Sequence, residues 1–373
     1  MLLDNQNFWN EKYKIENGKN AFLSEKMIHI RRQRPKLAEN QRYTIDIFPE
    51  NSTIQLWIQT GGCTFSKTGS CTMCDYWIGK NLKEPYKIVE EALVPYKNKY
   101  DTLIFNTCGS PFDEKELSVY DQEKIWEVIN RMGFCVVIIE THALTITEEK
   151  LKRLKQNINA ILIIEMGLES SNNDVLLYCL NKQVNLRMIS EKIELVHAYS
   201  MKCCVNILLG IPFLDIRDRC IDCVKSINDV LRVGADTCAV FPINIKDYTL
   251  VKQLYDNDMY NRVFGRELVW VLNQFSEKSL SKINIAWAKE RKQNNQMYKG
   301  IILPPYFCEY CQEEAYKLLD RYNEEYDGKM RRKIVEDLEK ATRCCEKLLL
   351  ESMEQEKNTY NILKACYEYL EGI

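Results

Sequence analysis

The chain has 373 residues, with 51 lysines and arginines against 53 aspartates and glutamates and a formal net charge of −2. This near balance argues against an obligate polyanion-binding protein, although a local basic patch is compatible with it. The chain also has 16 cysteines, no apolar leader among its first residues and no apolar run long enough to span a bilayer. These features predict a cytoplasmic protein whose thiols serve metal or redox chemistry instead of disulfides.

Residues 1–50 are predicted to form an N-terminal extension ahead of the first clear strand. They contain a basic run at 29–36, His-Ile-Arg-Arg-Gln-Arg-Pro-Lys. Such a run either contacts a nucleic acid or acidic substrate or forms a solvated loop, and the solvated loop is the more common outcome.

Strand and helix patterns alternate over residues 51–260. Apolar, β-branched runs predict strands at 53–60, 101–107, 135–140, 160–166, 203–209 and 236–241. Amphipathic stretches between them predict helices at 88–96, 114–132, 147–156, 188–199 and 217–233. This alternation implies parallel strands with right-handed crossovers, which form either a doubly wound sheet or an incomplete barrel.

Three cysteines, Cys63, Cys71 and Cys74, follow the first predicted strand in the stretch Gly-Gly-Cys-Thr-Phe-Ser-Lys-Thr-Gly-Ser-Cys-Thr-Met-Cys. Three thiolates from one short loop can hold three irons of a 4Fe-4S cluster and leave the fourth iron open for a substrate or cofactor. The alternatives are a structural zinc site or unrelated buried thiols. Zinc normally takes four ligands, and no fourth cysteine or histidine lies close by in sequence.

Polar or glycine-containing segments follow each of the predicted strands. They are the cysteine loop, 106–113, 140–142, 165–170, 210–212 and 242–244. In barrels, chemistry gathers on the loops at the carboxyl ends of the strands, so this placement favours the barrel over the doubly wound sheet. We therefore predict an α/β fold with a partial (β/α)6 TIM-type barrel over 51–260.

Residues 261–373 predict a mostly helical C-terminal appendage, in which 329–357 forms one long amphipathic helix. Two cysteine pairs lie in this region, Cys308 with Cys311 and the adjacent Cys344 with Cys345. They could form a second metal site for zinc or another iron–sulfur cluster, although adjacent cysteines ligate one metal only with awkward geometry. The alternative is that the adjacent pair belongs to the helix core.

Several motifs together resemble the radical S-adenosylmethionine (SAM) enzymes, and in particular the radical SAM subunit of archaeosine synthase. The elongator-type acetyltransferases and methylthiotransferases are more distant. The shared features are the Cys-x7-Cys-x2-Cys spacing with Cys-Thr-Met-Cys at 71–74, Gly109-Ser110, Gly167-Leu168-Glu169, Asn181-Lys182, the 241–244 and 249–251 segments and Pro-Pro-Tyr-Phe-Cys at 304–308. The resemblance covers about residues 50–345.

The resemblance implies a 4Fe-4S cluster and SAM as cofactors, with an external electron donor of the flavodoxin or ferredoxin type. Reductive cleavage of SAM would give a 5′-deoxyadenosyl radical. The matching positions imply that Gly109 and Ser110 meet the SAM amino group and that Lys182 pairs with its carboxylate. They also imply that Glu140 or Glu169 binds the ribose, and that Gly210-Ile211-Pro212 borders the adenine. Gly109-Ser110 could instead be an ordinary turn, and Lys182 could be a solvated side chain.

The favoured function is a radical SAM enzyme that abstracts hydrogen from a small-molecule, carrier-bound or peptidyl substrate. The balanced charge and the lack of a recognisable RNA-binding module make a nucleic-acid substrate the weaker alternative. His142 stands where the relatives usually carry arginine, which predicts an altered substrate pocket. The alternatives are a tRNA-modifying radical SAM lyase and a non-catalytic iron–sulfur or zinc protein. No catalytic residue is assigned.

Overall fold

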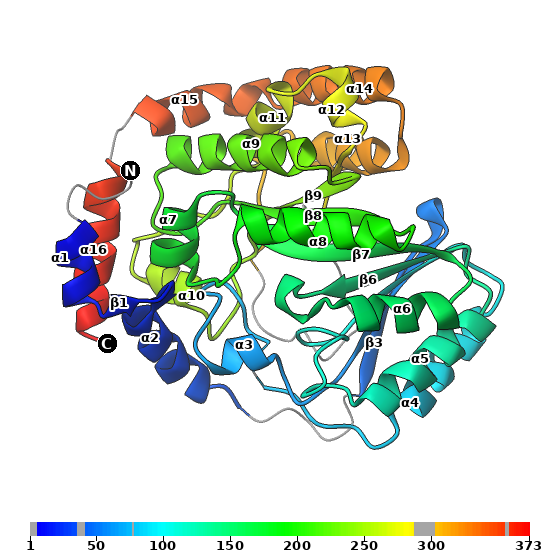
Figure 1. Cartoon of the computed structure of the whole chain (residues 1–373). Helices are drawn as coiled ribbons and strands as arrows, with labels where there is room; N and C mark the ends of the chain where they lie inside the picture. The colour runs from blue at the N-terminus through cyan, green and yellow to red at the C-terminus, as the bar shows by residue number, and fades with distance from the viewer. Residues whose placement is uncertain (1–5, 36–41, 77, 287–302, 355–357) are drawn as a thin grey trace.

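The computed structural model describes residues 6–35, 42–76, 78–286, 303–354 and 358–373, and an eight-stranded sheet forms its centre (Figure 1). The strand order is β10-β9-β8-β7-β6-β5-β4-β3, so strands that follow one another along the chain are neighbours in the sheet. The pairs from β4 to β10 are parallel, and β3 is antiparallel to β4. The predicted α/β fold with a partial TIM-type barrel is confirmed.

The six predicted strands are all present, and one further strand lies at each edge of the sheet. The bounds are β3 Tyr43–Phe48, β4 Thr53–Ile58, β5 Thr102–Asn106, β6 Val136–Thr141, β7 Ile161–Glu169, β8 Lys202–Leu209, β9 Thr237–Pro242 and β10 Ile283–Ile285. The prediction did not include β3 and β10. Because β10 pairs with β9, the sheet extends into the region predicted to be a helical appendage.

Helices cover the outer side of the curved sheet (Figure 1). They are α4 Pro85–Leu93, α5 Val119–Arg131, α6 Glu148–Asn157, α8 Leu186–Ala198 and α9 Ile216–Arg232. Side chains alternate between the two faces of each strand, so Ile139 and Ile164 are fully buried under the helices while their neighbours Glu140 and Glu165 point to the concave side. The concave side is therefore polar where the helix-covered side is apolar.

Each of the last four of these helices begins at a side chain that accepts a hydrogen bond from a backbone amide in the first turn. These residues are Ser118, Thr147, Asn185 and Asp215. Such caps satisfy amides that have no partner within the helix. The caps, together with the apolar stripes, explain why the predicted helix positions agree with the structure.

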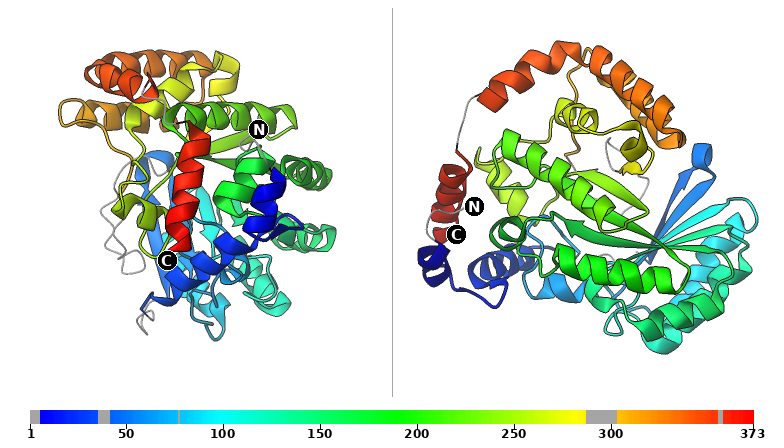
Figure 2. Two further views of the ribbon diagram at one scale, coloured as in Figure 1. Left: turned by 90° about the vertical axis from the view of Figure 1, so that its left-hand side faces the viewer. Right: turned by 45° about the horizontal axis from the view of Figure 1, so that its top comes forward.

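The N-terminal segment packs against the last helix of the chain, as Figures 1 and 2 show. It contains α1 Gln6–Lys12, the hairpin β1 Ile15–Glu16 and β2 Lys19–Asn20, and α2 Ala21–Arg32, and the last helix is α16 Thr359–Glu371. The Tyr367 ring lies 5.0 Å from that of Trp9 and 4.7 Å from that of Tyr13. The Tyr367 hydroxyl accepts a hydrogen bond from Asn20 Nδ2 at 2.7 Å and donates one to Tyr178 O at 2.7 Å.

The helices after β9 lie over one end of the barrel, at the top of Figure 1. They are α11 Gly265–Asn273, α12 Glu277–Leu280, α13 Gln312–Glu324, α14 Gly328–Ala341 and α15 Glu346–Glu354, whereas α10 Leu250–Asp256 lies lower, next to α2. A buried ion pair between Arg219 and Glu267 connects α9 to α11. None of the helices in the described parts of the chain is long and apolar enough to cross a bilayer.

The prediction of one continuous helix over 329–357 is wrong. The helix α14 ends at Ala341, a 3-10 turn follows at Arg343–Cys345, and α15 begins at Glu346. Thr342 lies at the break, where its Oγ1 donates to Leu338 O at 2.7 Å and accepts from the Arg266 guanidinium at 3.0 Å. These bonds hold Thr342 outside regular helix geometry, and in the 3-10 turn that follows Cys345 is buried while Cys344 is exposed.

Candidate functional site: a cysteine loop at the mouth of the barrel

Cys63, Cys71 and Cys74 lie in the loop after β4, at the carboxyl ends of the parallel strands. A single helical turn, α3 (Thr64–Lys67), follows the first cysteine, and Cys74 N donates to Cys71 O at 3.0 Å. Burial, followed by the charges of Cys74 and Cys71, raises the pKa of Cys63. Burial also raises the pKa of Cys74, to about 12. This donor set fits three irons of a 4Fe-4S cluster.

Arg31 of α2 supports the cysteine loop from behind. Its side chain is 0% exposed, and its guanidinium donates at 2.5–2.8 Å to four backbone carbonyls of the loop, those of Ser66, Ser70, Cys71 and Cys74. The expectation of a solvated basic loop at 29–36 is therefore wrong for Arg31, which is an interior residue of a helix. Residue 36 lies outside the described residues.

A second contact between α2 and the cysteine loop excludes any side chain at Gly69. A Cβ at this position would lie 2.3 Å from Ser24 O, and Gly69 has φ +84°. Asn181 Nδ2 donates to Gly69 O at 3.0 Å and to Ser24 Oγ at 2.8 Å, while its Oδ1 accepts from Asn20 N at 3.1 Å. Asn181 is left-handed, with φ 50°, and ends a π-helical turn at Leu176–Leu180. The loop, α2 and this turn form one hydrogen-bonded unit.

Lys182 follows that turn and forms a largely buried ion pair with Glu169. Lys182 Nζ lies 2.7 Å from Glu169 Oε1, and the two side chains are 7% and 13% exposed. Burial lowers the pKa of Lys182, but the charges of Glu169 and Cys71 outweigh it and raise that pKa overall. The two residues were predicted to bind different parts of SAM; the structure brings them together beside the cysteine loop.

Two pairs of a glutamate and an asparagine line the concave side of the barrel, Glu140 with Asn106 and Glu165 with Asn206. Glu140 and Glu165 are register partners on β6 and β7. Glu140 accepts a hydrogen bond from Asn106 Nδ2. Burial, and then the charge of Glu165, raise the pKa of Glu140 to about 8, and burial raises the pKa of Glu165 as well. Asn206 Oδ1 is buried and has no partner among the described residues, so it can accept a hydrogen bond from a bound molecule.

Gly109 and Ser110 follow β5, but they face different ways. A Cβ on Gly109 would lie 2.8 Å from the Cα and Cβ of Cys63, so only glycine allows this approach to the cysteine. The Ser110 hydroxyl is buried and lies 2.5 Å from that of Thr141 and 2.7 Å from that of Thr145. Gly109 therefore borders the cysteine loop, whereas the Ser110 hydroxyl is occupied within the fold.

Gly210 and Pro212 follow β8 and are held by the segment after α10. A Cβ on Gly210 would lie 2.1 Å from a methyl carbon of Val263, and the residue has φ +96°. Gly210 O accepts a hydrogen bond from the Tyr260 hydroxyl at 2.5 Å. Pro212 is buried. The glycine is thus required by packing within the chain.

His142 stacks on Phe65 of α3, with the ring centroids 3.8 Å apart and the planes at 14°. Its Nδ1 accepts from Leu144 N at 3.2 Å. Burial, followed by the charge of Lys182, lowers the pKa of His142 to about 3. The imidazole is therefore neutral at ordinary pH, and it packs β6 against the cysteine loop.

The four C-terminal cysteines come together although their elements are separate. Their Sγ atoms all lie within 4.8 Å of one another. The Sγ distances are 3.4 Å for Cys308–Cys311, 3.4 Å for Cys308–Cys344, 3.6 Å for Cys311–Cys345 and 3.8 Å for Cys344–Cys345. A tetrahedral site with Zn–S bonds of about 2.3 Å needs S–S separations of about 3.8 Å. The 3-10 turn between α14 and α15 removes the difficulty expected for adjacent ligands.

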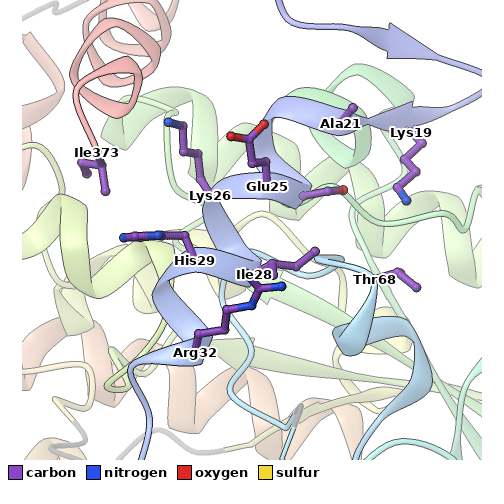
Figure 3. A pocket seen from close by; sticks show the side chains of 10 residues that line it. Lys19, Ala21, Glu25, Lys26, Ile28, His29, Arg32, Thr68 and Ile373 are labelled. Carbon is purple, nitrogen blue, oxygen red and sulfur yellow. The ribbon is translucent and has the colours of Figure 1, made fainter.

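The outer face of α2 forms one wall of a basic pocket of about 500 Å³ (Figure 3). Its cationic lining residues are Lys19, Lys26, His29 and Arg32, with Glu25 as the acidic residue and Thr68 from the cysteine loop. No ion pair within the described part of the chain engages these lysines or the arginine. The basic run predicted from the sequence thus has two faces, one buried against the cysteine loop and one open.

Comparison with known proteins gives distant relatives. No protein-family model matches the chain. An uncharacterized protein of Methanocaldococcus jannaschii is 23% identical over 247 residues, covering 62% of this chain and 67% of the relative. Archaeosine synthase subunit beta of Methanosarcina acetivorans is 24% identical over 233 residues, covering 60% of this chain and 67% of the relative.

This chain resembles archaeosine synthase subunit beta. The resemblance inferred from the cysteine spacing and the downstream motifs is thereby confirmed. Among solved structures, queuine lyase from Clostridium spiroforme bound to SAM and queuine is 23% identical over 54% of this chain and 79% of that chain, with a TM-score of 0.39. That likeness is distant.

Two residues of this archaeosine synthase-like chain were missed in the sequence analysis, Arg31 and Glu116. Glu116 is 7% exposed and accepts hydrogen bonds from Thr60 Oγ1 at 2.9 Å and Ser110 N at 3.1 Å. No sequence signal marks it, because it stands in a run of charged residues. Arg31 had a signal, since it lies eight residues after Leu23 and four after Met27, on the apolar stripe of α2.

Proposed function

We propose that this chain is a radical SAM enzyme and that Cys63, Cys71 and Cys74 hold its 4Fe-4S cluster. The observation that supports this most directly is the three-thiol loop at the carboxyl ends of the barrel strands, backed by the buried guanidinium of Arg31. When bound, the cluster and SAM would supply a 5′-deoxyadenosyl radical for hydrogen abstraction, after one electron from a flavodoxin- or ferredoxin-type donor.

The protein's own residues would bind and orient SAM. We propose that Gly109 lets the SAM amino group approach beside Cys63, and that the Lys182–Glu169 pair presents a cation to the carboxylate and an acceptor to the ribose. Glu140 is the second candidate for the ribose. Gly210 and Pro212 would border the adenine. The contribution of Ser110 would come from its backbone, since its hydroxyl is bonded to threonines.

Anaerobic reconstitution tests the cluster assignment. We expect about four irons and four sulfides per chain at this site, and loss of all of them in the Cys63→Ala/Cys71→Ala/Cys74→Ala variant. The wild-type protein, once reduced, should convert SAM to 5′-deoxyadenosine and methionine or use it reversibly. A triple variant with an unchanged visible spectrum would refute the site. A reduced, loaded protein that ignores SAM would leave the non-catalytic iron–sulfur alternative.

We propose a small-molecule, carrier-bound or peptidyl substrate. Two features support this, the near-zero net charge and the buried Asn206 Oδ1 on the concave side, an acceptor without a partner among the described residues that suits a hydrogen-bond donor such as an amine. The competing proposal is a tRNA-modifying lyase, as the name of the archaeosine synthase relatives suggests. The basic pocket on α2 supports that alternative.

A structural zinc ion at Cys308, Cys311, Cys344 and Cys345 is a second, separate proposal. It is supported by four Sγ atoms within 4.8 Å of one another, contributed by two distant stretches of sequence. Hydrogen bonds from the other three thiols oppose the effect of burial and lower the pKa of Cys308 to about 7, so one thiolate is present near neutral pH. Zinc binding would fasten the start of α13 to the junction of α14 and α15.

A further inference from the structure

Arg31 is a buried cation without an acidic partner among the described residues. Its hydrogen-bond partners are all backbone carbonyls, and within the described part of the chain no carboxylate lies within ion-pair distance of it. The nearby carboxylate of Asp75 is instead 3.4 Å from Arg34 and 3.4 Å from Lys246. Burying a charge is costly unless opposite charge accompanies it, so this position calls for an anion.

The groups that can supply this anion are the three cysteines. Two of the carbonyls that Arg31 binds belong to Cys71 and Cys74 themselves. The guanidinium is therefore fixed against the backbone that carries the ligands, and it cannot swing away without breaking four hydrogen bonds.

We propose that Arg31 is the counter-charge of the iron–sulfur site: it positions the cysteine loop and makes the bound cluster easier to reduce. The proposal rests on the cluster assignment above. Reduction by one electron from an external donor adds one negative charge to the cluster and breaks no bond. A fixed cation in a water-poor setting stabilises the more negative state more strongly, so it raises the reduction potential.

Another arginine of the chain provides a matched control. Arg331 is also 0% exposed, and it donates to the backbone carbonyls of Glu325, Leu280 and Ile283 and to Asn284 Oδ1. It lies in α14, at the opposite side of the molecule from α3 of the cysteine loop (Figure 1). Arg331→Met therefore removes a buried guanidinium of the same bonding type and reports the purely structural cost of such a change.

The test is an anaerobic redox titration of the reconstituted protein without SAM, followed by electron paramagnetic resonance of the reduced cluster. We expect Arg31→Met to lower the reduction equilibrium constant at least tenfold, equal to a midpoint shift of about 59 mV to more negative potential. Arg31→Lys, which keeps the charge, should shift it less, and Arg331→Met should leave it unchanged. An unchanged midpoint in loaded Arg31→Met, or an equal shift in Arg331→Met, would overturn the proposal.

Hydrogen exchange of the metal-free protein tests the positioning role separately. The amides of Thr68, Gly69 and Ser70 donate to carbonyls within the loop and should exchange at least tenfold faster in Arg31→Met than in the wild type or Arg331→Met. Equal exchange would overturn the positioning role. If the wild-type protein takes up no cluster, the proposed function fails, but this measurement still decides what Arg31 does.

Discussion

Glu116 lies directly behind Gly109, within reach of the cysteine loop. A Cβ on Gly109 would lie 2.1 Å from Glu116 Oε1, and the Thr60 and Thr107 hydroxyls both donate to Oε2. Burial is the main cause that raises the pKa of Glu116 to about 7 from its ordinary 4.5. A carboxyl shifted in this way prefers its neutral form in the folded protein.

We predict a pH-dependent stability difference between the wild type and Glu116→Gln. The pKa of Glu116 is higher in the folded than in the unfolded protein. Its protonated form therefore stabilises the folded state; this stabilisation is fully present below about pH 4.5 and is lost as the pH rises to about 7. As the pH rises from 5 to 7.5, the difference in free energy of unfolding, variant minus wild type, should increase by about 2 kcal/mol. Urea denaturation of the metal-free proteins measures this, and parallel pH profiles would contradict it.

The three loop cysteines could be proposed as a ligand set from sequence, because candidate ligands in one short segment have a recognisable spacing. Glu116 was not identified, because a charged side chain in a charged run predicts exposure unless its tertiary contacts are known. Arg31 was overlooked although its spacing from Leu23 and Met27 places it on the apolar stripe of α2. The pairing of Lys182 with Glu169 was also out of reach, since 13 residues and a π-helical turn separate them. Residue types led to the chemistry proposed for the site; the partners of each side chain came only from the fold.

At the scale of elements, the approach of α2 to the cysteine loop depends on Gly69. We predict that Gly69→Ala destabilises the protein more than Gly18→Ala does, and that it lowers cluster retention. Both glycines have left-handed backbones, with φ +84° and +72°, but a Cβ on Gly18 would meet nothing within 4 Å. Gly18→Ala should therefore cost only about 1–2 kcal/mol, the penalty of the conformation itself.

The additional loss in Gly69→Ala measures the close approach to Ser24. Thermal unfolding of the metal-free variants and iron content after reconstitution are the two measurements. Equal melting temperatures for the two variants would show that α2 can move away from the loop without cost.

A further prediction concerns the proposed zinc site at the junction of α14 and α15. Protein purified without chelators should contain about one zinc per chain, and the Cys63→Ala/Cys71→Ala/Cys74→Ala variant should keep it. Cys311→Ser and Cys345→Ser should lose the zinc and melt at lower temperature, while Cys135→Ser, which changes an exposed cysteine elsewhere, should do neither. Protein free of zinc, or zinc that survives both substitutions, would contradict the site.

Elements with a repeating pattern were predicted well, and those without one were not. The strand predicted at 101–107 is β5, Thr102–Asn106, and the helix predicted at 217–233 is α9, Ile216–Arg232. The antiparallel strand β3 lies outside the strand–helix alternation, and β10 has only three residues, too few for a period. The break after Ala341 depends on Arg266, which is distant in sequence.

The whole molecule provides the test of the substrate class. We predict weak binding of bulk tRNA, because 51 basic and 53 acidic residues leave no general excess of positive charge for phosphate neutralisation. Filter binding over a range of salt concentrations measures this. Tight binding that falls steeply with salt, or SAM cleavage stimulated by tRNA, would favour the tRNA-modifying alternative.

In that event the basic pocket of α2 is the first surface to examine. Lys26→Glu and Arg32→Glu reverse charges that line it (Figure 3), while Lys364→Glu on α16 serves as a control. Loss of tRNA binding in the first two variants alone would assign the contact to α2.

The contact between the first and last helices also bears on when the protein can take up iron. A chain of hydrogen bonds joins the last helix to the cysteine loop. Asn20 donates to the Tyr367 hydroxyl and to Asn181 Oδ1, and Asn181 Nδ2 donates to the carbonyl of Gly69 in the loop. A ribosome adding about 5–20 residues per second needs roughly 15–60 s to pass from the loop to Tyr367. During that interval the three cysteines are already exposed to the cell, but the bonds that shape their loop are incomplete. Metal loading on the nascent chain would therefore meet an unfinished site, which favours insertion after residue 367 has emerged.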